Sequence, residues 1–142
     1  MSNAHNTAPE KGTVSPFQDS ADGIVSSIGS LPFPDQQMAP CWVEISHDGR
    51  FLFTVNTASG SVSSYSISRD GSLTLDGSTA LSGTGLGAVD ERLSPDGHWL
   101  FVVESKADAV ATLTVDDGSL SESAGSPTSL PAGAAPAGIA VN

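Results

Sequence analysis

The chain has 142 residues, of which 38% are hydrophobic, and its 16 acidic residues against five basic ones give a formal net charge of −11. This composition predicts a single folded domain rather than a disordered chain. Because phosphate binding requires a concentrated set of Lys and Arg side chains, the charge argues against a protein that binds nucleic acid or an anionic membrane. We expect the acidic excess to promote solubility; a cation or a basic partner is the alternative explanation.

Cysteine content and targeting signals set few further limits. Cys41 is the only cysteine, so no disulfide can form within the chain. Residues 1–12 contain no apolar run of signal-peptide length, and no later segment is long and apolar enough to predict a membrane span. If Met1 is the first residue of the protein, these features predict a cytoplasmic location.

The start of the chain predicts a tail followed by part of a β-unit. Residues 1–11 are polar and lack periodicity, which predicts a disordered tail. Residues 12–18 and 24–28 are predicted strands joined by a turn. Two closely spaced prolines predict a loop over 31–38, because proline cannot donate a hydrogen bond to a β-ladder.

An internal repeat organises the remainder of the chain. Asp48-Gly49 recurs as Asp96-Gly97, an offset of 48 positions, and apolar residues recur at the same offset in alternation with others. The matched apolar pairs include Phe51 and Trp99, Phe53 and Phe101, Val55 and Val103, and Val62 and Val110. A repeat of this length, made of short alternating strands, is typical of the blades of a β-propeller.

Two complete blades of four strands are predicted, over segments 39–80 and 87–128, with strands that end near residues 76 and 123. In the first blade the strands are expected at residues 41–46, 50–56, 61–68 and, as a short edge strand, 72–75. The second blade repeats this pattern.

Partial blades are predicted at both ends. Residues 12–30 match the second half of a blade, and residues 135–142 match the first strand of a further one. The predicted fold is therefore an all-β, incomplete β-propeller domain over residues 12–142, because two blades and two partial blades do not close a ring.

The innermost strand of the second copy carries three consecutive charges. Asp90, Glu91 and Arg92 stand where the first copy has the sequence Trp-Val-Glu. Inner strands line the channel of a propeller, where charge can be hydrated or used to bind a ligand. Asp90 and Arg92 share one side of the strand, since neighbours along a strand alternate. The alternative to a ligand site is an ion pair between Asp90 and Arg92 that packs one blade against the next.

Four sequence motifs from the two copies carry a resemblance to a known family: Pro40-Cys41-Trp42-Val43, Ser46-His47-Asp48-Gly49-Arg50, Asn56-Thr57-Ala58-Ser59-Gly60, and Ser94-Pro95-Asp96-Gly97. Together they resemble the lactonase family of seven-bladed β-propellers, which includes bacterial 6-phosphogluconolactonases and fungal carboxy-muconate lactonising enzymes. The resemblance covers residues 12–142 and corresponds to the C-terminal third of a full-length member.

The resemblance implies a hydrolase of carbohydrate metabolism in which water attacks the ring carbonyl of a sugar-acid lactone at the channel mouth. The matching motifs are turns and strand positions, so no catalytic residue of the family carries over. Lactone hydrolysis requires a carboxylate to activate water and a cation or amide donors for the oxyanion. The candidate catalytic residues are Asp90, Glu91 and Arg92. The candidate ligand-binding residues on the same rim are Trp42, Glu44, Asn56 and Glu104.

The remaining chemistry-bearing residues have ordinary explanations. No set of His, Cys and carboxylate residues has the spacing of zinc ligands, and we expect no cofactor. His47 and His98 are expected to be solvated turn residues at the opposite end of the propeller from the rim. Cys41 is expected to be a small buried residue. Trp42 and Trp99 are expected to anchor the core between blades.

Two classes of function follow from these features. The first is a lactone hydrolase that is completed by further blades and acts on a small-molecule lactone. The second is a non-catalytic propeller module that binds a protein or a small ligand and closes as a homo-oligomer. Exposed apolar faces on the end blades favour a partner in either case.

Overall fold

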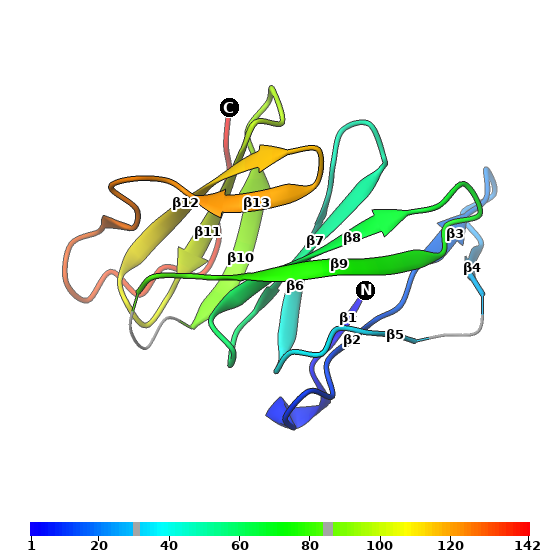
Figure 1. The fold of residues 1–142 in the computed structure, drawn as a ribbon, viewed down its shortest axis with the longest axis horizontal. Coiled ribbons are helices and arrows are strands. Elements are labelled where there is room, and N and C mark those ends of the chain that lie inside the picture. Colours follow the sequence, from blue (N-terminus) through cyan, green and yellow to red (C-terminus); the bar gives the residue numbers. More distant parts are fainter. Residues whose placement is uncertain (30–31, 84–86) are drawn as a thin grey trace.

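The computed structural model describes residues 1–29, 32–83 and 87–142. Regular structure in these residues is β-strand, apart from one turn of 3₁₀ helix at His5–Thr7. A four-stranded sheet and a five-stranded sheet lie side by side (Figure 1). The predicted all-β, incomplete propeller is confirmed.

The first complete blade, blade 1, is an antiparallel meander. Its strands, paired in chain order, are β6 (Pro40–Ile45), β7 (Phe51–Asn56), β8 (Ser61–Ile67) and β9 (Leu73–Ala80). The edge strand β9 is longer than the four residues expected, because Ala80 still pairs with Ser61 at the far end of β8. Its residues after Leu75 are mostly exposed, so they lack the apolar alternation that marks a strand in the sequence.

Blade 2 repeats this arrangement. Its strands are β10 (Ala88–Leu93), β11 (Trp99–Glu104), β12 (Ala109–Asp116) and β13 (Ser119–Glu122). A two-residue strand, β14 (Thr128–Ser129), also pairs with β12, beyond the end of β13. The strand order expected for both blades is present.

The same turn joins the first two strands of each blade. The Asp48 carboxylate accepts hydrogen bonds from the Ser46 hydroxyl at 2.6 Å and from the Arg50 backbone N–H at 3.1 Å. Asp96 makes the equivalent pair of bonds in blade 2. Gly49 follows with φ of 72°, a left-handed conformation that glycine adopts without strain.

One apolar core fills the interface between the two blades. It contains Phe53, Val55, Val62 and Leu81 from the blade 1 side and Ala88, Leu93, Leu100, Val102, Ala111 and Leu113 from blade 2. Burying one large aliphatic or aromatic side chain stabilises the fold by about 1.5–3 kcal/mol. One apolar face of blade 1 is therefore covered by blade 2.

The N-terminal residues form small strands against the other face of blade 1. These are β1 (Ser2–Asn3), β2 (Thr13–Val14), β3 (Phe17–Asp19), β4 (Val25–Ser27) and β5 (Phe33–Pro34). The strand expected at 12–18 is divided into β2 and β3, and the tail and loop, expected to lack strands, supply β1 and β5 as partners of β2. The start of the expected loop, residue 31, lies outside the described residues.

A second apolar core lies under these strands, formed by Val14, Leu52, Tyr65 and Leu73. Tyr65 is fully buried, and its hydroxyl donates a hydrogen bond to Asp35 at 2.7 Å. Asp35 is itself buried, and burial raises the pKa of its carboxyl. This bond ties the loop before β6 to the centre of blade 1.

Residues 135–142, expected to begin a further blade, form no strand. A strand requires a neighbouring strand with which to form a ladder. In its place, the Ile139 backbone N–H donates a hydrogen bond to the Asp90 carboxylate at 2.8 Å. The C-terminal segment is thus fastened to β10 by a side chain.

Candidate functional site

Glu44 on β6 and Arg92 on β10 form an ion pair between the inner strands of the two blades. The Arg92 Nη1 atom lies 3.0 Å from Glu44 Oε2, and the Leu93 backbone N–H donates to Glu44 Oε1 at 3.4 Å. The side chain of Glu44 is 13% exposed and that of Arg92 is 44% exposed. Arg92 is therefore held on one side by a sheltered carboxylate and open to solvent on the other.

Asp90 has other partners. Its two carboxylate oxygens accept the backbone N–H groups of Glu91 at 2.9 Å and Ile139 at 2.8 Å. The alternative expected from the sequence, an ion pair between Asp90 and Arg92, is not formed. Two backbone donors lie closer to Asp90, and Arg92 reaches Glu44 on the neighbouring blade.

Glu91 points to the opposite side of β10, into the interface with blade 1. It pairs with Val102, a core residue, and is fully buried. Neither of its carboxyl oxygens has a hydrogen-bond partner. Burial raises the pKa of Glu91 well above its ordinary value, and the charges of Glu44 and Asp90 raise it further. A fully buried carboxyl cannot touch a ligand without movement of the blades.

Asn56 and Glu104 occupy the same position in the two copies of the repeat and are both buried. The Asn56 amide donates to the hydroxyls of Ser61 at 3.1 Å and Ser63 at 2.9 Å. At the positions equivalent to these serines, blade 2 has alanines, and neither carboxyl oxygen of Glu104 has a partner. Burial, followed by the charge of Glu122, raises the pKa of Glu104. Asn56 and Glu104 are therefore buried inside the fold and are not exposed on the rim.

Trp42, the remaining candidate ligand-binding residue, is exposed on β6 with 47% of its surface accessible. Its carbonyl oxygen accepts a hydrogen bond from the Thr54 hydroxyl at 2.6 Å. Cys41 beside it is also exposed, contrary to the buried position expected. Trp99 is 39% exposed, so neither tryptophan anchors the core as expected; Phe53 and Tyr65 do.

A groove opens between the two blades at the end where β7 turns into β8. It has a volume of about 510 Å³ and is lined by Thr57, Ala58, Ser59, Gly60, Ala80, Leu81, Gly83, Gly87 and Lys106. The Thr57 hydroxyl donates to the Ala88 carbonyl at 2.6 Å and joins the blades there. Lys106 is the one titratable side chain among these lining residues.

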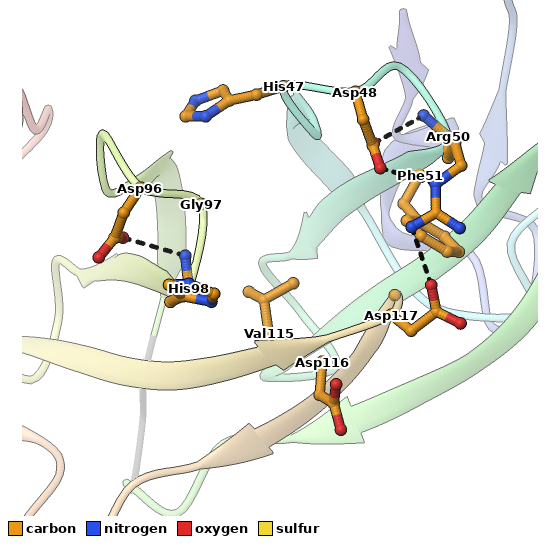
Figure 2. Close-up of a pocket in the computed structure, with 11 residues that line it drawn as sticks. His47, Asp48, Arg50, Phe51, Asp96, Gly97, His98, Val115, Asp116 and Asp117 are labelled. Carbon is orange, nitrogen blue, oxygen red and sulfur yellow. Dashed lines mark hydrogen bonds and ion pairs between the residues drawn. The ribbon is translucent and has the colours of Figure 1, made fainter.

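A second groove of about 290 Å³ lies at the other end of the same interface (Figure 2). Arg50 connects the two blades there: its Nε atom lies 2.6 Å from Asp48 and its Nη2 atom 2.9 Å from Asp117. The guanidinium also lies over the Phe51 ring, 4.9 Å from its centroid. Figure 2 shows the rings of His47 and His98 beside this groove, on the first turns of the two blades. The sequence placed both histidines at this end but gave no sign of the groove.

Carboxylates in the two first turns are stabilised in their charged form. Hydrogen bonds from the Ser46 hydroxyl and from Arg50 hold the pKa of Asp48 far below its ordinary value. The Ser94 hydroxyl and the His98 backbone N–H lower the pKa of Asp96. Among the described residues, no three His, Cys, Asp or Glu side chains are arranged to hold a metal ion. No helix in the described part of the chain could span a membrane.

Comparison with models of known families matched residues 2–141 to the family described as lactonase, 7-bladed β-propeller. The chain belongs to this lactonase family. The match confirms the resemblance seen in the repeat motifs, and the two complete blades correspond to two of the repeating units of such a propeller. No curated protein matched the chain significantly.

Solved structures share the fold of this chain at low sequence identity. A proposed 6-phosphogluconolactonase from Bacteroides uniformis has a TM-score of 0.75 at 21% identity, over 91% of this chain and 40% of the other. A second such protein, from Bacteroides fragilis, gives 0.67 at 23% identity, over 80% and 32%. A periplasmic gluconolactonase from Pseudomonas aeruginosa gives 0.58 at 23% identity, over 77% and 39%. The chain thus spans 32–40% of the length of these structures.

Proposed function

We propose that the chain forms part of a lactone hydrolase that opens a sugar-acid lactone. The observation that carries this proposal is the Glu44–Arg92 ion pair, which presents a fixed cation on the inner strands of a lactonase-family propeller. The names of the similar solved structures agree with this substrate class.

In the proposed reaction, water adds to the ring carbonyl, the bond between that carbon and the ring oxygen breaks, and a hydroxy acid is released. The negative charge that develops on the carbonyl oxygen is stabilised by Arg92, whose guanidinium is open to solvent on one side. Glu44 positions Arg92 and is the carboxylate nearest to it, so it is our candidate for the base that accepts a proton from water. Asp90 is a weaker candidate, because it makes no ion pair with Arg92; its oxygens accept the backbone N–H groups of Glu91 and Ile139 instead.

The proposal requires further blades, because two complete blades do not enclose a channel. Other copies of the chain or additional sequence would supply them. An apolar groove of about 240 Å³ on blade 1, lined in part by Phe17, Val43 and Ile45, leaves Ile45 53% exposed. This exposed surface favours association, and it also supports the second candidate function, a non-catalytic propeller module that binds a partner.

The test separates the protein into fractions whose mass is known from light scattering. The acid that each fraction releases from δ-gluconolactone and from 6-phosphogluconolactone is then measured with a pH-stat. We expect hydrolysis of the lactone above the spontaneous rate in fractions that contain a closed propeller. A closed propeller with no activity on either lactone would contradict the hydrolase proposal and favour the binding module.

A further inference from the structure

The interface between blades 1 and 2 contains an acid at a position where the preceding copy of the repeat has an aliphatic residue. Glu91 is equivalent to Val43, which packs against the second core of blade 1. Glu91 faces the corresponding core of the next interface, beside Val102, and is fully buried. The repeat therefore shows that the fold needs no carboxyl group at this position.

The surroundings of Glu91 oppose its ionisation. A buried carboxylate is tolerated when hydrogen bonds or an opposite charge replace water, and neither oxygen of Glu91 has a hydrogen-bond partner. The charged residues that face it are Glu44 from β6 and Asp90 and Arg92 from its own strand. Burial, Glu44 and Asp90 raise the pKa of Glu91, and the Val55 backbone N–H on β7 and Arg92 lower it by less than burial raises it. Strand β7, packed against β10, is Phe51–Asn56 and carries no charged residue.

Arg92 offsets the two acids only in part. Its guanidinium is already paired with Glu44, so the groups nearest to Glu91 leave a net negative field. The paired strand β11 adds Glu104, a second buried acid, two residues beyond Val102. Ionised Glu91 would meet a repulsive field without hydration, whereas neutral Glu91 fills the space that Val43 fills in blade 1.

We propose that Glu91 makes the contact between blades 1 and 2 proton-controlled: the neutral acid keeps the blades packed, and its ionisation loosens them. The loosened contact involves β10, which also carries Arg92. Proton binding at Glu91 would thus control how firmly the inner strands of the two blades are held together, whatever reaction the assembled protein performs.

The sign of the effect follows from linkage. The folded chain binds the Glu91 proton more tightly than the unfolded chain, for which the ordinary value is 4.5. Stability from this residue is fully present below that value and is lost as pH rises through the higher pKa of the folded state. Within this window the unfolding equilibrium constant rises by up to about tenfold per pH unit.

The test compares urea unfolding of the wild-type chain and Glu91→Gln from about pH 5 to about pH 8, a range that lies above the unfolded value. Because glutamine stays neutral, Glu91→Gln should become more stable relative to the wild type as pH rises. The ratio of the wild-type unfolding equilibrium constant to that of Glu91→Gln should increase by up to about tenfold per pH unit. Other buried acids affect both proteins equally, so the difference between them reports Glu91.

Two further variants complete the design. Glu91→Val, which carries the side chain of the preceding copy, should become more stable relative to the wild type in the same way as pH rises. It replaces Glu91→Gln in the comparison if that variant does not fold. Glu10→Gln, at an exposed acid of the N-terminal segment, should follow the wild type. Parallel pH profiles for the wild type and both Glu91 variants would overturn the proposal.

Discussion

Glu44 and Arg92 occupy the same position in the two copies of the repeat and bind each other across the blade interface, with 3.0 Å between Glu44 Oε2 and Arg92 Nη1. A pair of opposite charges at equivalent positions fixes the two inner strands relative to each other. It also leaves the guanidinium partly exposed, which is the arrangement required of a group that stabilises charge on a substrate.

Replacing Arg92 tests the role of that guanidinium. In the assembled protein, Arg92→Gln should lower kcat for lactone opening by about a hundredfold to a thousandfold, the usual loss when one oxyanion donor is removed. Arg69→Gln is the matched control, because Arg69 lies in an exposed turn between β8 and β9. Equal turnover by the two variants, measured by pH-stat, would remove Arg92 from the site.

Gly118 provides a test of the contact between blades. A Cβ atom at Gly118 would overlap the Phe51 ring, and the φ of Gly118, 82°, is left-handed. Gly118→Ala should therefore cost both backbone strain and displacement of Phe51, about 2–5 kcal/mol in total. Gly125→Ala is the control, because φ is 88° there but no atom lies within 4 Å. Equal urea midpoints for the two variants would show that Phe51 does not pack against Gly118.

The buried bond between Tyr65 and Asp35 should contribute measurably to stability. Tyr65→Phe removes the hydroxyl that donates to Asp35 Oδ1 and leaves a buried carboxyl without that donor. The expected cost is about 1–3 kcal/mol in the free energy of unfolding. A double-mutant cycle with Asp35→Asn measures the coupling, and strictly additive effects of the two changes would contradict a direct bond.

Acid should weaken the first turn of blade 1. The pKa of Asp48 is lowered by the Ser46 hydroxyl and by Arg50, so the folded chain favours the ionised carboxylate. Its contribution is present above the ordinary value of 3.8 and is lost as pH falls through the lower folded value. Unfolding midpoints of Asp48→Asn should converge with those of the wild type below that window. A variant at an exposed acid, Asp22→Asn, should keep a constant difference from the wild type; convergence there as well would make the effect non-specific.

The sequence predicted the blades well because the repeat reports two properties at once. Alternation along Phe51, Phe53 and Val55 reflects packing on both sides of a strand, and the Asp-Gly turns reflect local backbone geometry. Both signals are local. The strands β1 and β5 escaped prediction because each has only two residues and forms by pairing with β2, which no local pattern records.

The candidate site was predicted in its residues more than in its contacts. Strand alternation indicated that Asp90 and Arg92 share a side, but the partner of Arg92 comes from the neighbouring blade. The 48-residue offset shows that Glu44 and Arg92 occupy equivalent positions in the two copies. It does not show that the two side chains are close in space. Burial of Glu91 depends on how one blade covers the next, which is a property of the packed interface.

Amide hydrogen exchange of the purified chain tests most directly the central claim, that the two copies of the repeat fold as blades joined by one buried interface. The account predicts the slowest exchange in β7, β8, β11 and β12. Strand β10 should be protected to a similar degree, because the side of β10 that carries Glu91 packs against blade 1. Rapid exchange throughout β10 to β13 with protection of β6 to β9 alone would contradict it, since the second copy would then not be packed against the first.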